Sequence, residues 1–390
     1  MNVVRTDAST YEWHIITCEY PPQIGGVSDC TATFAALLGA DAPTHVWCPR
    51  IDTAALAPPA GVEVHRELGD FSVRDLRRVG RLLDERSAAR RLFVQWVPHG
   101  YGHRSVNLPM ACWLLMRAWW HRDDLQVLVH EPCAPLSLRP GLLAAALVHR
   151  LMLVLVCLGA STVWESTPSW GPIIRPYLLG RIRPQWLPIP AATAAVSSPP
   201  RALASDDSPL VVGHFGTFSP SVAPILESAL EVVLERTSAH VRLIGRGSER
   251  FMSELLRHRP ECAPRVHAAG VLPLSSLAGE FAACDVMLQP YPDGISARRT
   301  SSLALLRAGL PVVTNEGVLC ETFWQQEDAV ELLHEASGGA IGEATVRLLA
   351  DPDRRAVLAR NAESMYARYF DTSHITSALV RRTPHTPWAS

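Results

Sequence analysis

Short apolar runs alternate with longer amphipathic stretches along most of the chain, and loops rich in glycine or proline separate them. Runs such as 13–18 (WHIITC) and 125–129 (LQVLV) are typical of buried strands in a parallel sheet. The stretch 71–83 instead places apolar residues at helical spacing, with arginines between them. The repeated order of strand, loop and helix predicts an α/β fold with parallel sheets.

The first half of the chain is expected to hold six strands and the helices that connect them. The strands are expected at 13–18, 45–48, 62–64, 90–97, 125–129 and 161–165, and the helices at 28–38, 71–83, 108–121 and 142–158. The last of these helices is the most hydrophobic run, but His149 and Arg150 interrupt its centre. Because the clean stretch after them is too short to span a bilayer, we expect a helix buried in the protein.

A stretch from 181 to 208 is rich in proline, alanine and serine and has no periodicity, which is typical of a linker. A second alternating series follows, with strands at 210–215 and 241–244 and a helix at 222–235 between them. We therefore expect two domains and a helical C-terminal segment that crosses back to the first domain. Their expected bounds are 1–190 for the first domain, 191–209 for the linker, 210–365 for the second domain and 366–390 for the C-terminal segment.

The most informative stretch lies between Cys284 and Glu316. An apolar run at 285–289 predicts a strand, which ends in a loop that contains two prolines and a glycine. A helix is expected next, with Ser296 as its N-cap, and a further strand begins at 312–313. The stretch therefore places a helix N-terminus directly after the carboxyl end of a strand.

Such a helix N-terminus favours an anion, because its free N–H groups and its dipole both attract negative charge. Arg298, Arg299, Thr300 and Ser301 add hydrogen-bond donors around the first turn. The predicted ligand is a phosphate or pyrophosphate. The alternative is an exposed first turn with two solvated arginines.

Charge and composition exclude several kinds of ligand and of catalytic group. The net charge is −2, so neither disorder nor a surface for nucleic acid is indicated. The sequence contains no lysine, so all 36 basic residues are arginines. This excludes a Walker-type phosphate lysine and a lysine nucleophile, and any charged phosphate clamp must be arginine.

The nine cysteines are scattered, without a CxxC pair or a close cluster with histidine. We therefore expect reduced thiols, no metal site and no cofactor. The first residues lack the apolar core of a signal sequence, so we expect a cytoplasmic protein.

Several loops of the first half carry candidate ligand-binding residues. Gly25 and Gly26 follow the first strand and let the backbone approach a ligand, although a plain tight turn explains them equally well. His130 follows the strand at 125–129, at the edge where doubly wound sheets bind ligands, and a hydrogen-bonded structural histidine is its alternative. The residues expected to face an acceptor are His99, Tyr101, His103 and Glu131.

The predicted helix at 108–121 carries three of the eleven tryptophans. Such an aromatic stripe most often belongs to the core. A binding site for an apolar acceptor, or weak association with a membrane surface, is the alternative.

With both halves laid out, the chain resembles the group-1 (family 4-like) glycosyltransferases of the GT-B fold over nearly all of its length. The order of strand, polar loop, helix and GLPVVT is similar to the donor-site signature of this family and is the most specific support. The segments that carry the resemblance are YPPQIGGVSD, HEP, HFGTFSP, LIGRG and FAACDVMLQPYPDGISARRTSSLALLRAGLPVVTNEG.

The resemblance implies two Rossmann-like, doubly wound domains that face each other across a cleft. It implies an acceptor bound by the first domain, a nucleotide-sugar donor bound by the second, and transfer with retention and without metal. His130 matches the histidine beside the transferred sugar, and with Arg298 and Arg299 it forms the expected catalytic set. The residues expected to bind the donor are Gly25, Gly26, Gly216, Thr217, Arg246, Asp293, Gly294, Ile295, Ser296, Ala297, Thr300 and Ser301.

The sequence departs from the family pattern at charged positions. Thr217 and Val222 stand where the family has an arginine and a lysine for the pyrophosphate, and Ser296 and Ala304 stand in place of two glutamates. The nearest substitutes for the lost positive charges are Arg298 and Arg299, with Arg246 next, and Asp293 is the candidate for the first lost glutamate. We therefore expect a glycosyltransferase that acts on an acceptor hydroxyl of a small molecule or glycan. The alternative is a catalytically impaired accessory protein that binds a nucleotide or sugar.

Overall fold

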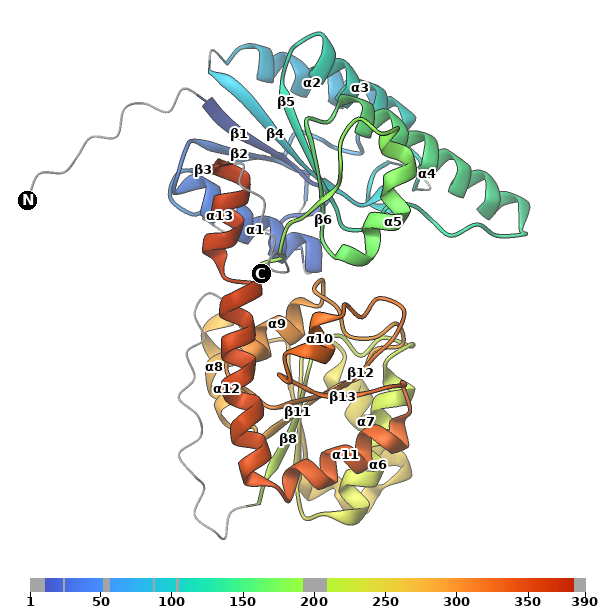
Figure 1. Cartoon of the computed structure of the whole chain (residues 1–390), viewed down its shortest axis with the longest axis vertical. Coiled ribbons are helices and arrows are strands. Elements are labelled where there is room, and N and C mark those ends of the chain that lie inside the picture. Colours follow the sequence, from blue (N-terminus) through green and yellow to red (C-terminus); the bar gives the residue numbers. More distant parts are fainter. Residues whose placement is uncertain are drawn as a thin grey trace, which may run out of the picture. The chain divides into compact units, whose positions relative to one another are not determined.

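The computed structural model describes residues 11–23, 25–51, 57–86, 88–102, 105–191 and 209–381. The chain divides into two compact units, of which the first comprises 1–190 and 372–390 and the second comprises 191–371. Each unit is built on one parallel sheet flanked by helices (Figure 1). Most of the linker expected at 191–209 lies outside the described residues.

The sheet of the first unit has seven parallel strands in the order β3-β2-β1-β4-β5-β6-β7. In chain order they are β1 (Tyr11–Ile16), β2 (Thr44–Trp47), β3 (Val62–His65), β4 (Ala89–Trp96), β5 (Asp124–Val129), β6 (Thr162–Glu165) and β7 (Gln185–Trp186). The order changes direction between β1 and β4. In a doubly wound sheet the ligand crevice therefore lies at the carboxyl ends of these two strands.

The helices of the first unit connect these strands, and the last one comes from the C-terminal end of the chain. They are α1 (Gly26–Gly39), α2 (Val73–Asp84), α3 (Leu108–Trp119), α4 (Pro140–Gly159), α5 (Gly171–Ile174) and α13 (Thr372–Arg381). Ile375, Ala378 and Leu379 of α13 belong to the same core cluster as Trp13 and Phe34. The return to the first unit thus begins at Thr372.

The sheet of the second unit has six parallel strands in the order β10-β9-β8-β11-β12-β13, and its direction changes between β8 and β11. The strands are β8 (Val211–Phe215), β9 (His240–Ile244), β10 (Val266–Gly270), β11 (Val286–Gln289), β12 (Val312–Asn315) and β13 (Glu331–Leu333). The sequence analysis did not predict β10 or β13. The first is a short run containing two alanines and a glycine, and the second has only three residues, so neither carries a strand pattern of its own.

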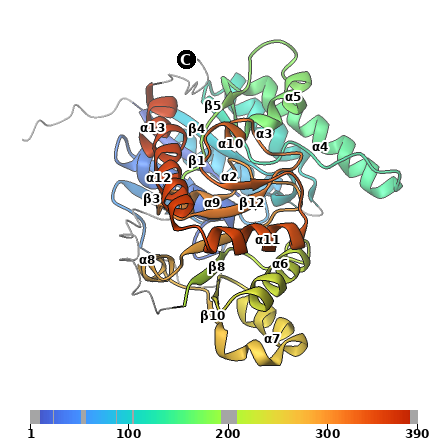
Figure 2. The same cartoon turned by 60° about the horizontal axis from the view of Figure 1, so that its bottom comes forward.

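Seven helices of the second unit lie in its described part. They are α6 (Ala223–Arg236), α7 (Ser248–His258), α8 (Leu274–Ala282), α9 (Thr300–Arg307), α10 (Phe323–Gln326), α11 (Gly338–Leu349) and α12 (Pro352–Tyr369). Helices α6 and α11 lie side by side (Figure 2), while α9 packs on α12. Helices α7, α10 and α11 were not predicted from the sequence. The first turn of α11 is rich in glycine, and α10 has only four residues.

Helix α4 differs from the buried helix that was expected. Ala146, Met152 and Val156 face the core, but Leu142 and Leu147 are more than half exposed. Within the described residues, α4 is also the one helix long and apolar enough to cross a membrane by length and composition alone. The helix expected to be buried in the protein is therefore buried on one face only, because hydrophobicity by itself does not specify how many faces are covered.

Candidate functional site

The carboxyl ends of β8 and β11 meet at the switch point of the second sheet. The Nε2 of Gln289 at the end of β11 donates to the carbonyl of Phe215 at the end of β8, at 2.8 Å. The loops after β8 and β9 also touch closely, since a Cβ on Gly245 would lie 2.0 Å from the carbonyl oxygen of Gly216. Gly245 has φ of 122°, a conformation that favours glycine. The loops that carry Gly216, Thr217 and Arg246 thus share one edge of the sheet.

Helix α9 begins at this edge, but its N-cap lies three residues later than predicted. Its N-cap is Arg299, without a side-chain capping bond, and not Ser296. Ser296 is fully buried, and its carbonyl accepts the N–H of Arg299 at 3.0 Å. The prediction of Ser296 as N-cap is therefore wrong, because residues before Thr300 form a separate turn that tertiary contacts hold in place.

Tyr291 links this turn to the first turn of α9. Its hydroxyl lies 2.8 Å from the Oγ of Ser302 and 3.1 Å from that of Ser301. Its backbone exchanges two hydrogen bonds with the side chain of Asn315, the last residue of β12, at 2.9 and 2.7 Å. The loop after β11 is therefore fixed to both neighbouring elements.

Arg298 and Arg299 both bind one carboxylate of the same loop. The Nη2 of Arg298 lies 2.8 Å from Asp293 Oδ2, and Arg299 pairs with Asp293 Oδ1. The guanidinium of Arg299 also stacks on the ring of Tyr291, 4.4 Å from its centroid. Asp293, the candidate for the first lost glutamate, has both carboxylate oxygens paired with two adjacent arginines in this geometry. Together the three side chains carry one net positive charge.

Gly294 sets the path of this loop. It has φ of 85°, and a Cβ at this position would lie 2.3 Å from the backbone nitrogen of Gly317. Only glycine allows the two backbone segments to approach so closely. The backbone N–H of Ile295 then donates to the carbonyl of Asn315 at 2.9 Å, which places the next residues along β12.

Glu321 anchors the turn from the other side, and the sequence analysis did not single it out. Its two carboxylate oxygens accept the backbone N–H of Ala297 at 3.1 Å, and the Nε1 of Trp324 donates to Oε2 at 2.8 Å. The side chain is only 6% exposed. The available signal was an acidic residue inside the apolar run VLCETFW, but its partner lies 24 residues earlier in the chain.

His214 is a second residue of this edge that sequence reasoning missed. Its ring is buried, and its Nδ1 lies 2.7 Å from the carbonyl oxygen of Leu288, so Nδ1 is the donor. Burial lowers the pKa of His214 to about 4, so the ring is neutral at pH 7. Its Nε2 faces the Gly216 loop and has no hydrogen-bond partner among the described residues. It therefore offers an acceptor beside this loop.

In the first unit, His130 lies directly after β5. Its Nε2 is 2.8 Å from Oε1 of Gln95 at the end of β4, and its carbonyl accepts the indole N–H of Trp170 at 2.9 Å. The carboxamide oxygen can only accept, so Nε2 carries a proton. His130 is thus held in one orientation at the edge where the ligand crevice of this sheet is expected.

Gly25 and Gly26 lie at the start of α1, but a carboxylate of the chain already occupies this position. A Cβ on Gly25 would lie 2.5 Å from the Oε2 of Glu19, whereas a Cβ on Gly26 would meet nothing within 4 Å. A carboxylate at a helix N-terminus satisfies the same donors that a phosphate would use. The geometry therefore gives Gly25 a reason to be glycine without a donor phosphate.

The four candidate acceptor residues differ in their surroundings. His99 Nδ1 lies 3.3 Å from Glu131 Oε2, and both side chains are well exposed. Tyr101 is fully buried against Phe71, and its hydroxyl donates to the carbonyl of Gln95. A buried ring offers an acceptor no surface, so the structure gives Tyr101 a role in the core. The fourth candidate, His103, lies outside the described residues.

Glu165 ends β6, next to β5, and was not predicted as a site residue. Burial raises the pKa of Glu165 to about 8, so its carboxyl group is mostly protonated at pH 7. Its Oε2 and the hydroxyl of the following Ser166 are buried and have no hydrogen-bond partner among the described residues. The carboxyl end of this sheet thus offers a neutral acid and a hydroxyl close to the strand that leads to His130.

Two doubly wound parallel sheets in one chain, each with polar loops at its switch point, are the architecture of the GT-B fold. No protein-family model and no curated protein matches the sequence. Solved structures do match it. The sucrose-phosphate synthase of Thermosynechococcus elongatus superposes with a TM-score of 0.70 at 14% identity, over 95% of this chain and 98% of that one.

Two further structures have the same fold. HepE of Anabaena in complex with UDP-glucose gives a TM-score of 0.64 at 17% identity, over 95% of this chain and 98% of that one. An α,α-trehalose-phosphate synthase (UDP-forming) of Burkholderia xenovorans in complex with glucose-6-phosphate gives a TM-score of 0.62 at 12% identity, over 92% of this chain and 97% of that one. The GT-B fold implied by the resemblance is thereby confirmed.

Proposed function

We propose that the protein transfers a sugar from a nucleotide-sugar donor to an acceptor hydroxyl, with the donor bound by the second unit. The observation that carries the proposal is the arginine pair at the start of α9, beside the switch point of the second sheet. The proteins named above support it, since one was crystallised with UDP-glucose and another is described as UDP-forming.

The proposed chemistry depends on the leaving diphosphate. Negative charge grows on this group as the glycosidic bond breaks, and preorganised cations and N–H groups stabilise it. Arg298 and Arg299 supply this charge, and Ser301 with the N-terminus of α9 supplies further donors. Asp293 is already paired with both arginines, so we propose front-face attack with retention and without metal, in preference to a covalent intermediate on this carboxylate.

The first unit presents the acceptor in this proposal, with His130 as its contact to the transferred sugar. The fixed orientation of His130 on Gln95 supports a positioning role at the edge of this sheet. Glu165 is a further candidate donor to an acceptor oxygen, since its protonated carboxyl group is buried at the same edge. No cofactor besides the donor is required.

A second candidate function is binding of a nucleotide or sugar without turnover, as in an accessory protein. The observation that favours it is that Asp293 neutralises one of the two positive charges of the arginine pair, together with Thr217 and Val222 at the places of the usual cations. A diphosphate must then compete with an internal ion pair. Both candidates predict nucleotide binding, and only the first predicts transfer.

Thermal unfolding with a panel of nucleoside diphosphates tests the proposed function. We expect one base to raise the melting temperature by several degrees, because a ligand at 100 times its Kd adds about 2.7 kcal/mol to the stability of the folded state. Release of nucleoside diphosphate from the matching donor, measured with and without acceptors, then separates transfer from binding alone. If no nucleoside diphosphate shifts the transition, the proposed donor site is wrong.

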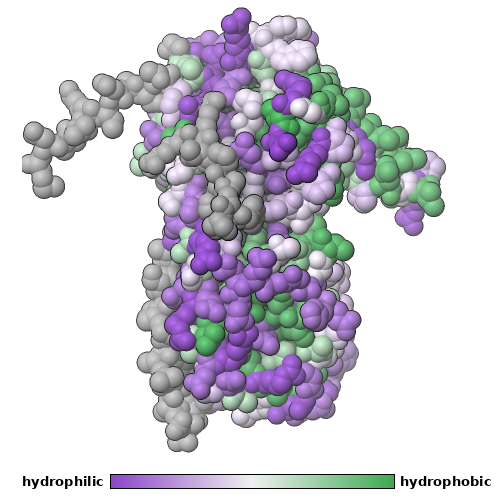
Figure 3. All heavy atoms as spheres, viewed as in Figure 1, coloured by the Kyte–Doolittle hydropathy of each residue, from purple (hydrophilic) through white to green (hydrophobic). Residues whose placement is uncertain are grey.

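We also propose that the acceptor is apolar and that the first unit docks on an anionic membrane surface to reach it. Large apolar side chains gather on the outside of α3 and α4 (Figure 3). An apolar cavity of about 470 Å³ lies beside them, lined by Leu76, Trp113 and Met116 together with the two exposed tryptophans at the end of α3. The exposed side chains of this α3–α4 surface are Trp119, Trp120, Leu136, Leu138, Leu142, Leu143, Leu147 and Leu151.

The charges around this surface favour anionic lipid over a second protein. Residues 132–183 contain five arginines and one acidic residue, Glu165, which is buried. Exposed arginines beside a continuous apolar face are typical of proteins that lie in the membrane interface. Because α4 packs one face on α3, it suits docking in the interface and not a membrane span.

Co-sedimentation with vesicles tests this docking. We expect the protein to bind vesicles containing phosphatidylglycerol and to bind pure phosphatidylcholine much less. The double variant Leu142→Glu/Leu147→Glu should lose most of this binding, because two charges would have to enter the apolar interface. Val271→Glu, at an exposed apolar position of the second unit, is the matched control. Equal binding of all three proteins would contradict the docking surface.

A further inference from the structure

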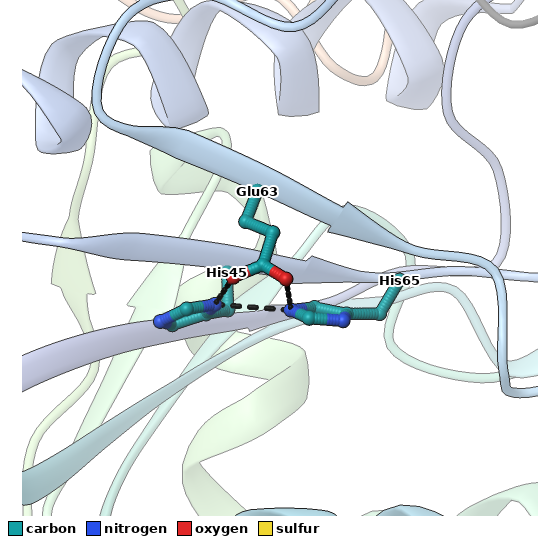
Figure 4. A group of neighbouring side chains, drawn as sticks. All are labelled: His45, Glu63 and His65. Atoms are coloured by element: carbon teal, nitrogen blue, oxygen red, sulfur yellow. Dashed lines mark hydrogen bonds and ion pairs between the residues drawn. The ribbon is translucent and has the colours of Figure 1, made fainter.

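We propose that His45, Glu63 and His65 bind a zinc ion, with water as the fourth ligand. His45 lies on β2, while Glu63 and His65 lie on the edge strand β3 (Figure 4). His45 is directly opposite Glu63 in the register, and His65 is two residues further along the same strand. Because side chains two apart share one face of a strand, the three groups converge on one side of the sheet.

The spacing of the ligand atoms fits a tetrahedral metal site. His45 Nδ1 lies 3.0 Å from His65 Nε2 and 3.2 Å from Glu63 Oε2, and His65 Nε2 lies 3.7 Å from Glu63 Oε1. Ligands bound to zinc at about 2.0–2.1 Å in a tetrahedron are separated by about 3.3 Å. Two histidines and one glutamate are also a known zinc ligand set that leaves a position for water.

Aromatic stacking holds both imidazoles in place. The ring of His65 stacks on Trp47 with centroids 4.2 Å apart and planes 15° apart, and His45 stacks on His14 at 5.1 Å and 18°. The side chains of His45 and His65 are only 7% and 15% exposed, whereas that of Glu63 is 62% exposed. The imidazoles are thus preorganised, and Glu63 provides the side from which an ion can enter.

A second carboxylate lies behind the first ligand. Glu12 Oε2 is 3.6 Å from His45 Nε2, is buried, and has no hydrogen-bond partner among the described residues. A metal-binding histidine commonly donates its other ring N–H to a carboxylate, which fixes its tautomer. Glu12 is positioned to accept a hydrogen bond from Nε2–H once Nδ1 binds the ion.

In this structure, the positive charge of Arg86 lies next to two of the proposed zinc ligands and disfavours a bound cation. Its Nη1 lies 3.0 Å from His45 Nε2, and its Nη2 lies 3.7 Å from Glu63 Oε2. A guanidinium can only donate, so in this arrangement the proton of His45 sits on Nδ1. Zinc binding therefore requires the proton of His45 to move from Nδ1 to Nε2. It also requires Arg86 to shift toward Glu12, from which Arg86 Nη1 is 3.5 Å away. Removal of Arg86 should consequently tighten metal binding.

The site lies at the edge of the first sheet and not at its switch point. It connects the edge strand β3 to β2, whereas the ligand crevice of this sheet lies at the ends of β1 and β4. A bound ion would stabilise the pairing of the edge strand β3 with β2, which is its one neighbour in the sheet. The inference does not depend on the proposed sugar transfer.

Titration of the metal-free full-length chain with Zn²⁺, followed by calorimetry, tests the site, and Co²⁺ absorption reports the coordination geometry. We expect one equivalent to bind with a Kd below about 1 μM and Co²⁺ to give a tetrahedral spectrum. His65→Ala and Glu63→Gln should each weaken binding roughly 100-fold or more, while Arg86→Ala strengthens it. His258→Ala, which removes an exposed histidine paired with Glu227, is the control and should change nothing.

Glu63→Gln keeps the inference falsifiable if His65→Ala does not fold, because the Glu63 side chain is mostly exposed and its amide has the same shape. Unchanged affinity in Glu63→Gln, an octahedral Co²⁺ spectrum, or a wild-type Kd weaker than about 100 μM would each overturn the proposed site.

Discussion

Glu321→Ala is expected to destabilise the second unit by about 3 kcal/mol or more. The carboxylate accepts the backbone N–H of Ala297 and the indole N–H of Trp324, and it is nearly fully buried. The variant leaves both donors unsatisfied inside the protein and also creates a cavity. Since Ala297 belongs to the turn before α9, we expect the donor-binding loop to lose its position as well.

Denaturant unfolding measures the first effect, and affinity for the nucleoside diphosphate found in the thermal screen measures the second. Glu321→Gln keeps the size of the side chain and should fall between the wild type and Glu321→Ala. Glu335→Ala, an exposed glutamate of the same unit, is the control and should stay within about 0.5 kcal/mol of the wild type. If Glu321→Ala matched this control, the anchoring role would be wrong.

The double variant Arg298→Ala/Arg299→Ala is expected to lower sugar transfer at least about 100-fold. Each arginine is assigned one or more charge-assisted hydrogen bonds to the leaving diphosphate, and each bond is worth about 1.5–3 kcal/mol. Either single variant should lose about ten-fold or more. The loss should be larger in kcat than in substrate binding, because the diphosphate charge is greatest in the transition state.

Asp293→Asn tests whether Arg298 and Arg299 bind the diphosphate or only hold their loop in place. It removes the carboxylate that now holds both arginines, so the nucleoside diphosphate should bind more tightly, although the loop loses its internal ion pairs. Arg257→Ala, on the last turn of α7, is the surface control. Wild-type rates of sugar transfer in the double variant would show that the arginines do not stabilise the leaving diphosphate, and their assigned role would be wrong.

The candidate site shows which features local sequence information predicts and which it does not. Proline and glycine after β11 correctly predicted a loop that leads to a helix, since these residues act through their own backbone. The start of α9 was misplaced because Ser296 lies in a turn held by Glu321, far along the chain. Asp293 was the candidate for the first lost glutamate, and in the structure its carboxylate pairs with the two arginines of its own loop. Pairings of this kind depend on loop geometry that no spacing rule records.

The first unit shows the same limit. Tyr101 stands in a loop of polar residues, yet its ring is in the core, and α4 is strongly apolar, yet several of its leucines are exposed. Composition describes a residue's preference for burial, whereas burial itself depends on which elements pack against it. Glu165 and the histidine cluster at His45 likewise become visible only when neighbouring strands are aligned.

The sequence by itself determined the alternating α/β pattern of both units, the loop with the arginine pair and the exclusion of lysine chemistry. These features follow from periodicity and residue type, which act over a few neighbouring positions. Only the tertiary structure decided how the arginines are paired, what anchors their loop, which face of α4 is exposed and which histidines converge. Each of these depends on strand order and register, which bring together side chains that are distant in the sequence.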